Sequence, residues 1–149
     1  MKVYMQNIRI AIDGPAASGK STTARLLAQK LGYIYIDTGA MYRAATLAVL
    51  QNNLDIHDES DVEKCIRANK ISIKRINGEQ HTFLNEKDVN HLIRTPQINQ
   101  VISVISSYAG VREILVKQQQ AMARQGAVVM DGRDIGTVVL PEAELKVFM

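Results

Sequence analysis

The sequence has little of several features, and each scarcity narrows the classes of protein that it can encode. It contains one cysteine, Cys65, so no disulfide can form within the chain, and we expect a reducing compartment, the cytoplasm. No run of lysine and arginine resembles a nucleic-acid-binding arm. The first seven residues are polar, and no apolar stretch is long enough for a secretory signal or a membrane span. We therefore expect neither nucleic acid nor a membrane as a partner.

What the chain does contain is typical of one soluble globular domain. Of its 149 residues, 46% are hydrophobic and 22% are charged. This length is enough to bury a core without disulfides or structural metals. The formal charge of +3 suits a small anionic ligand. We expect a monomer, because nothing in the sequence points to a protein partner.

The N-terminal part of the chain predicts a parallel strand–helix–strand unit. Residues 8–12 are apolar and rich in isoleucine, and the Asp-Gly-Pro that follows them indicates the end of a buried strand. Apolar residues recur at helical spacing over residues 20–31, and Gly32 stands where a C-terminal cap belongs. A second apolar run covers residues 33–36. Further strands of the same sheet are predicted at residues 127–130 and 145–149.

The middle of the chain has a different character. Two strand-like runs, residues 71–76 and 79–84, flank Asn77-Gly78, which is the strongest short-range signal for a hairpin with a type I′ turn. Such an antiparallel hairpin inside a parallel α/β pattern indicates an inserted subdomain. The other segments predicted here are a helix at 40–52, a polar connection at 55–61, a helix from Pro96 to about 107 with Thr95 as N-cap, and a helix at 111–125.

A phosphate-binding loop follows the first predicted strand. The pattern Gly-x-x-x-x-Gly-Lys-Ser is matched in full between a predicted strand and a predicted helix, as a P-loop requires. Its backbone N–H groups can turn toward phosphate oxygens, and the helix adds its positive N-terminal end. Lys20 can reach the β- and γ-phosphates, and the Ser21 hydroxyl is a candidate Mg²⁺ ligand. The predicted phosphate-binding residues are Gly14, Pro15, Ala16, Ala17, Ser18, Gly19, Lys20, Ser21 and Thr22.

Two polar clusters end other predicted strands. Ligands of open α/β sheets bind beyond the carboxyl ends of the strands, so residues 37–43 (DTGAMYR) and 131–134 (DGRD) are expected to open onto the P-loop crevice. Arg43 is a candidate for clamping a second phosphate with paired hydrogen bonds. One carboxylate of residues 131–134 is expected near Mg²⁺ or in contact with a substrate.

With these motifs, the sequence resembles the bacterial cytidylate kinases, a family of nucleoside monophosphate kinases. The resemblance is carried by IDGPAASGKS, DTGAMYR, Ile93-Arg94-Thr95, Val111-Arg112-Glu113 and DGRDIGTVV at 131–139. It implies a kinase of pyrimidine metabolism that uses ATP and Mg²⁺ to convert CMP or dCMP into CDP or dCDP, releasing ADP. It also implies an α/β fold: a P-loop NTPase-type parallel sheet flanked by helices, with a monophosphate-binding insert that contains the antiparallel hairpin.

The resemblance further implies domain limits and roles for single residues. We expect residues 1–149 to form one incomplete P-loop kinase domain that lacks the family's C-terminal lid helix and fifth strand. Within it, the monophosphate-binding region is expected at 38–110 and its hairpin insert at about 62–90. The implied roles are catalytic for Lys20 and Arg133, CMP phosphate binding for Thr38 and Arg43, and cytosine recognition for Ser103, Arg112 and Asp134.

Other P-loop proteins are alternatives to this interpretation. A GTPase is excluded, because no aspartate has a glycine three residues later and the guanine motif Asn-Lys-x-Asp is absent. A related kinase with another acceptor remains open, and so does a nucleotide-dependent switch with no acceptor. The switch would hydrolyse ATP at the same rate with and without CMP.

Overall fold

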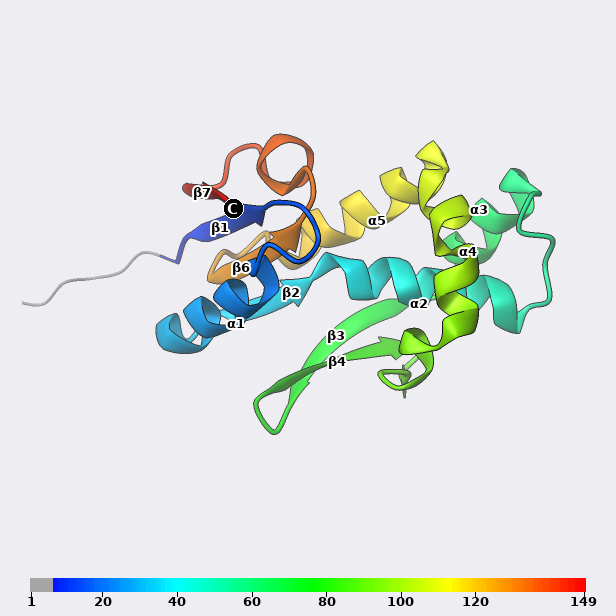
Figure 1. Cartoon of the computed structure of the whole chain (residues 1–149), viewed down its shortest axis with the longest axis horizontal. Coiled ribbons are helices and arrows are strands. Elements are labelled where there is room, and N and C mark those ends of the chain that lie inside the picture. The colour runs from blue at the N-terminus through cyan, green and yellow to red at the C-terminus, as the bar shows by residue number, and fades with distance from the viewer. Residues whose placement is uncertain (1–6) are drawn as a thin grey trace, which may run out of the picture. The chain divides into compact units, whose positions relative to one another are not determined.

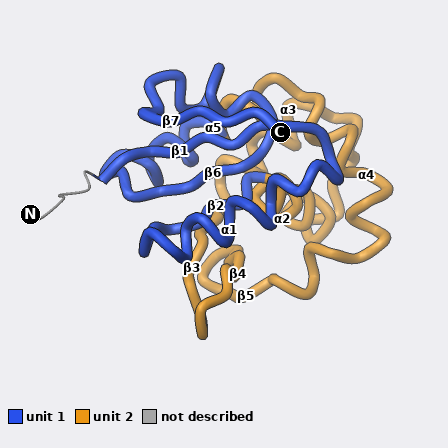
Figure 2. Tube along the Cα trace, turned by 60° about the vertical axis from the view of Figure 1, so that its left-hand side comes forward, with its two compact units in different colours: residues 1–38, 116–149 blue, residues 39–115 orange. Residues whose placement is uncertain are grey.

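The computed structural model describes residues 7–149, which divide into two compact units (Figures 1 and 2). Unit 1 comprises the described residues up to Thr38 together with Val116–Met149, and unit 2 comprises Gly39–Leu115. Residues 1–6, most of the polar N-terminal stretch noted above, lie outside the described part. The elements are β1 (Arg9–Asp13), α1 (Lys20–Leu31), β2 (Ile34–Asp37), α2 (Thr38–Gln51), α3 (Glu59–Ala68), β3 (Ile71–Ile76), β4 (Glu79–Leu84), β5 (Lys87–Asp88), η1 (Leu92–Arg94), α4 (Pro96–Ser107), α5 (Ala109–Met122), β6 (Val128–Gly132), η2 (Ile135–Val139) and β7 (Leu145–Phe148).

Unit 1 is built on a four-stranded parallel sheet in the order β2-β6-β1-β7. The prediction of a parallel sheet is therefore confirmed. β1 is an inner strand, and its Ile10 faces Val129 of β6 on one side and Leu145 of β7 on the other. The interiors of β1 and β6 are buried, which suits their isoleucine and valine residues. The carboxyl ends of β1, β2 and β6 consequently meet at one edge of the sheet.

Helix α1 packs on this sheet through the apolar stripe that the sequence predicts. Ala24 and Ala28 are completely buried in a cluster with residues of β1, β2 and β6, and Leu27 and Leu31 pack against its margin. Gly32 ends the helix with φ 70°, and its N–H bonds back to the carbonyl oxygens of the last turn. A left-handed glycine in this position is the expected C-terminal stop. Helix α1 therefore holds the loop before it firmly against the sheet.

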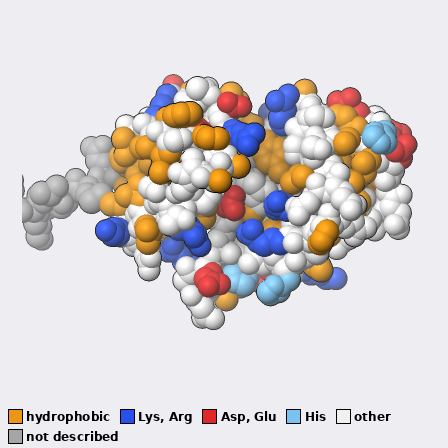
Figure 3. Space-filling model, viewed as in Figure 1, with side chains coloured by type: hydrophobic (Ala, Val, Ile, Leu, Met, Phe, Trp, Pro, Cys, Tyr) orange, Lys and Arg blue, Asp and Glu red, His pale blue; other side chains and the backbone are white. Residues whose placement is uncertain are grey.

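The outer strands of unit 1 leave apolar side chains exposed. Ile34 of β2 is 60% exposed and Phe148 of β7 is 80% exposed. Hydrophobic atoms are accordingly visible at the surface among polar ones (Figure 3). Such edges keep unpaired backbone groups available for another strand. Among residues 7–149, no helix has the length and apolarity needed to cross a membrane.

Unit 2 contains the predicted antiparallel hairpin. Strands β3 and β4 pair from Ile71 opposite Leu84 to Ile76 opposite Glu79. The turn residues Asn77 and Gly78 have φ values of 52° and 81°, as a type I′ turn requires. The short strand β5 adds a third member that the sequence did not suggest. The hairpin prediction is confirmed.

The helices of unit 2 follow the predictions with small departures. Thr95 is the N-cap of α4 and Pro96 is its first residue, as predicted, but the Thr95 side chain makes no capping hydrogen bond. Its hydroxyl donates instead to the carbonyl oxygen of Leu92, because the 3-10 turn η1 precedes the helix directly. The polar connection predicted at 55–61 ends sooner, since α3 begins at Glu59 with the Asp58 side chain accepting from the Asp61 N–H.

Candidate functional site

The loop between β1 and α1 leaves main-chain donors without a side-chain cap. The N-cap of α1 is Gly19, with φ 86°, and the first helical turn carries no acidic residue. The first N–H groups of a helix have no partner within the helix, and the helix dipole makes this end positive. Ser18 adds a buried hydroxyl that has no hydrogen-bond partner among the described residues. These features are what a phosphate-binding loop needs.

Gly14 begins this loop at a point where only glycine fits. Its φ of 159° is extended, so the requirement is one of space. An added Cβ would collide with the carbonyl oxygen of Met149 and lie 3.1 Å from the Ser18 hydroxyl. Lys20 projects from the first residue of α1, and its ammonium group donates to the carbonyl oxygen of Pro15 at 3.4 Å. Lys20 thus lies along the loop that it is predicted to serve.

Asp131, at the end of β6, is the centre of a buried polar cluster. It is only 2% exposed, and its carboxylate accepts from the Ser21 hydroxyl at 2.7 Å and from the Tyr35 hydroxyl at 2.8 Å. The Thr38 hydroxyl donates to the Asp131 carbonyl oxygen at 2.9 Å. The sheet produces this convergence, because Asp37 of β2 lies directly opposite Asp131 in the parallel register. The start of α1 is therefore tied to the ends of two strands.

Burial is the main cause of the shifted pKa values in this cluster. Burial raises the pKa of the Asp131 carboxyl above its usual value, while the hydrogen bond from Ser21 acts in the opposite direction and the charge of Asp37 raises it further. Burial, followed by the charges of Asp37 and Asp131, also raises the pKa of the Tyr35 hydroxyl. Tyr35 consequently keeps its proton and acts as a donor to Asp131.

Ser21 and Asp131 fit a divalent cation of the Mg²⁺ type. Both present hard oxygen atoms within hydrogen-bond distance of each other, at the mouth of the loop. Mg²⁺ prefers oxygen ligands and commonly takes only one or two from the protein, the rest coming from substrate phosphates and water. The sequence predicted Ser21 for this role and left open which carboxylate of residues 131–134 would join it.

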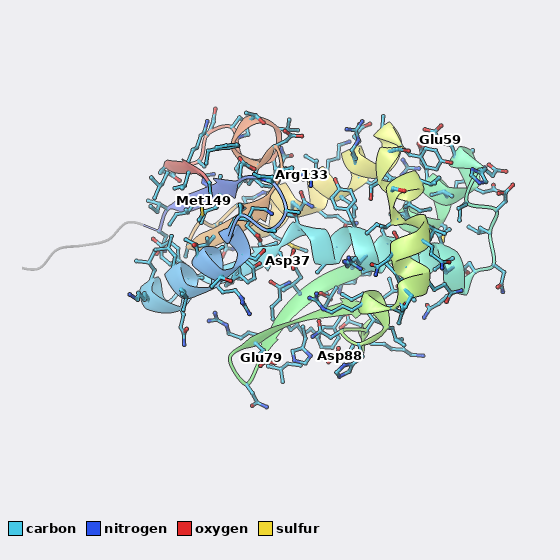
Figure 4. All side chains as sticks on the ribbon, in the orientation of Figure 1. Asp37, Glu59, Glu79, Asp88, Arg133 and Met149 are labelled. Atoms are coloured by element: carbon cyan, nitrogen blue, oxygen red, sulfur yellow. The ribbon has the colours of Figure 1, made fainter. Side chains whose placement is uncertain are left out.

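The turn after β6 carries Arg133 and Asp134 on its exposed side. Asp134 has a left-handed backbone with φ 59°, and residues 135–139 then form a π-helical turn, η2, that the sequence did not suggest. Asp13 holds this turn: its carboxylate oxygens accept from the N–H groups of Ile135 at 2.7 Å and Gly136 at 2.8 Å. Figure 4 shows Arg133 after β6 and Asp37 at the end of β2.

The predicted site residues of unit 2 differ in how they are held. Arg43 on α2 donates through one guanidinium nitrogen to the Ile93 carbonyl oxygen at 3.1 Å and to the Asn99 side chain at 2.7 Å. Ser103 on α4 and Arg112 on α5 are exposed. Arg43 is thus oriented within its unit, whereas the other two project into solvent.

Sequence reasoning gave no role to Asp13 or Tyr35. The sequence indicates Asp13 only as the end of a strand, because nothing local reveals that a turn more than a hundred residues away supplies its partners. Tyr35 belongs to the apolar run at residues 33–36, which indicates no polar role. A buried phenol usually finds a hydrogen-bond partner, and this rule was the available signal.

Comparison with known proteins adds independent information. A family model described as cytidylate kinase matches residues 10–149. A protein named cytidylate kinase from Caldicellulosiruptor bescii is 53% identical over 145 residues, covering 97% of this chain and 64% of the relative. Proteins of the same name from Bacillus cytotoxicus and Bacillus thuringiensis are each 50% identical over 144 residues, with the same coverage. The chain therefore spans 64% of the length of these curated relatives.

Proposed function

The chain belongs to the cytidylate kinase family, and on this premise we propose that the protein transfers the γ-phosphoryl group of ATP to CMP or dCMP, giving CDP or dCDP and ADP. The observation that carries the proposal is the cluster of Ser21, Tyr35 and Asp131 at the mouth of the uncapped loop. It combines main-chain donors for phosphate with oxygen ligands for a cation. Phosphoryl transfer needs both.

The donor nucleotide binds through the loop. Its N–H groups and the N-terminal end of α1 hold the phosphates of ATP, and the residues involved are Gly14 to Thr22. Lys20, whose ammonium group lies beside the Pro15 carbonyl oxygen, contacts the β- and γ-phosphates. Arg133 lies close to the transferring group. The charge that develops on the phosphoryl oxygens is stabilised mainly by this positioning and charge neutralisation.

Ser21 and Asp131 would hold Mg²⁺ beside the phosphates of ATP. When bound, the ion would supply charge neutralisation for the transferring phosphoryl group. The hydrogen bond from Tyr35 orients the Asp131 carboxylate for this task. Partners of ligating carboxylates commonly matter in this way, since they fix the ligand's direction.

The acceptor CMP binds through its phosphate and its base. Thr38 and Arg43 hold the phosphate, and Thr38 does so through its N–H at the start of α2, because its hydroxyl proton is already donated to Asp131. Ser103, Arg112 and Asp134 recognise cytosine, whose amino group suits a carboxylate. A site that forms hydrogen bonds with the polar groups of cytosine disfavours a base that lacks those groups. No general base is needed, since the acceptor phosphate is itself an anionic nucleophile.

We assign the monophosphate-binding region to about residues 38–110 and its hairpin insert to about 62–90. The compactness of residues 39–115 supports this division. The single incomplete kinase domain, the monomeric state and the cytoplasmic location expected from the sequence stay predictions.

The test is a substrate panel with the complete protein. ADP release is measured with ATP and Mg²⁺ in the presence of CMP, dCMP, UMP, AMP or no acceptor. We expect rapid ADP release with CMP and dCMP and matching formation of the diphosphates. Fast phosphorylation of a different acceptor, with CMP inert, would make the protein a related kinase of other specificity. ATP hydrolysis at one rate with and without acceptors would identify a nucleotide-dependent switch.

A further inference from the structure

We propose that Asp13 is a positioning residue that holds the turn bearing Arg133 and Asp134 against the start of the P-loop, an inference that rests on the proposed phosphoryl transfer. Asp13 ends β1, and Gly14, the first residue of the loop, follows it directly. Its carboxylate reaches across to the turn after β6. The two segments are thereby joined by one side chain.

The contact uses the whole carboxylate. One oxygen accepts from the Ile135 N–H at 2.7 Å and the other accepts from the Gly136 N–H at 2.8 Å. Hydrogen bonds to a charged acceptor are roughly twice as strong as neutral ones. Since both oxygens accept from main-chain N–H groups of the same turn, the Asp13 carboxylate acts on that turn.

The turn needs such an anchor because its backbone is in a sparsely populated conformation. Asp134 has φ 59° although it is not a glycine, and η2 is a single turn of π-helix. Both conformations are uncommon, and both occur preferentially at functional sites where the surrounding structure imposes them. The N–H groups that Asp13 binds are those of the first two residues of η2. Asp13 therefore holds the turn at the start of η2, directly after Arg133 and Asp134.

The surroundings of the anchor are closely packed. An added Cβ at Gly136 would lie 3.2 Å from the Lys146 side chain and 3.4 Å from an Asp13 oxygen. The Asp13 carbonyl oxygen also accepts from the Met149 N–H at 2.9 Å. Asp13 thus connects β1, the end of β7 and the turn of Arg133. We infer that the geometry of Arg133 relative to the P-loop depends on this one carboxylate.

The experiment compares Asp13→Asn and Asp13→Ala in the complete protein with wild type. Asp58→Asn and Asp58→Ala are matched controls, because Asp58 also caps a helix N-terminus through its carboxylate but lies in unit 2. Amide hydrogen exchange of Ile135 and Gly136 is measured alongside kcat and the KM values for ATP and CMP. The two readouts separate loss of the anchor from its effect on the reaction.

We expect exchange at Ile135 and Gly136 to accelerate at least about tenfold in Asp13→Ala. We expect kcat to fall by about ten- to a hundredfold, since small displacements of catalytic groups have effects of this order, while the KM for ATP stays within about threefold. The Asp58 variants should lose stability without this loss of kcat.

Three outcomes would overturn the proposal. The first is unchanged exchange at both amides in Asp13→Ala. The second is a fall in kcat no larger than in the Asp58 variants. The third is a rise in the KM for ATP with kcat preserved, which would place Asp13 in the P-loop alone. A wild-type protein that does not phosphorylate CMP would contradict the proposed function, and the exchange data would still decide whether Asp13 holds the turn.

Discussion

The two units hold their polar residues in opposite ways. In unit 1, Ser21, Tyr35 and Thr38 all donate to Asp131, which is buried at the ends of the strands. In unit 2, the charged side chains pair on the surface of the hairpin, where both Lys70 and Lys74 contact Glu86. Buried networks are costly to disturb, whereas exposed ion pairs contribute little. Unit 1 thus offers a preorganised polar cluster, whereas the charged side chains on the hairpin of unit 2 are exposed and weakly held.

The largest effect is expected when the positive charge is removed from the P-loop of unit 1. Lys20→Ala should reduce kcat/KM by at least about a hundredfold, because charge-assisted contacts to phosphate are worth roughly 1.5–3 kcal/mol each and more as charge develops. Stability should change little, since the side chain lies along the loop and not in the core. Lys30→Ala, at the exposed end of the same helix, is the control. Turnover within about threefold of wild type would contradict the role of Lys20.

A second test separates the residues of unit 2. Arg43→Ala should weaken all monophosphates alike, by about ten- to a hundredfold in KM, because a bidentate phosphate contact is lost. Arg112→Ala should instead narrow the preference for CMP over other pyrimidine nucleotides. Steady-state kinetics with CMP, dCMP and UMP measures both effects.

The control for this pair is Asn99→Ala, which removes a partner of Arg43 while keeping its charge. It should leave the KM values within about threefold of wild type. The same selectivity profile in the Arg43 and Arg112 variants would contradict the division between phosphate and base.

Tyr35→Phe removes one hydrogen bond from the buried cluster of unit 1 and keeps both predicted Mg²⁺ ligands. The loss of a hydrogen bond that lowers the pKa of Asp131 should raise that pKa further. Protons then compete better with Mg²⁺ for the carboxylate. The acidic limb of the pH–rate profile should therefore shift to higher pH, and the Mg²⁺ concentration for half-maximal activity should rise by about tenfold or more. Tyr33→Phe is the control, because its hydroxyl accepts from Ile8 instead. An unchanged Mg²⁺ requirement would show that Tyr35 does not orient Asp131.

The smallest effect is expected at an exposed ion pair of unit 1. The hydrogen bonds from Arg9 lower the pKa of the Glu144 carboxyl to about 2, below the usual 4.5. A depressed folded-state pKa stabilises the protein above pH 4.5, and this contribution is lost as the pH falls from 4.5 toward 2. Glu144→Gln should therefore lower the melting temperature slightly at pH 7, remove its fall between pH 4.5 and 2, and leave it nearly unchanged below pH 2. A large loss of stability at pH 7 would contradict this assignment.

Local signals explain what the sequence predicted well. The P-loop motif, the apolar stripe of α1 and the Asn77-Gly78 turn each depend on residues close together in the chain, and the structure contains the helix and turn that they imply. The parallel sheet followed from strand composition and the intervening helix. These elements were predictable because their neighbours in sequence decide them.

Long-range contacts explain what the sequence could not give. The conformation of η2 depends on Asp13, and the burial of Asp131 depends on Ser21 and Tyr35, which reach it from other elements. Thr95 failed as a capping side chain because η1 places a competing carbonyl oxygen beside it. In each case, the structure is decided by a contact with another element or a neighbouring turn, and the hydrophobic pattern of the sequence does not indicate such contacts.

The position of β1 inside the sheet also has a consequence for biosynthesis. Its partners β6 and β7 begin at Val128 and Leu145, so β1 is translated more than a hundred residues before either exists. At a synthesis rate of about 5–20 residues per second, the apolar side chains of β1 remain without their neighbouring strands for on the order of ten seconds. The β3–β4 hairpin, whose strands are joined by a two-residue turn, needs no such delay. A nascent chain would therefore acquire the structure of the hairpin before that of the P-loop sheet.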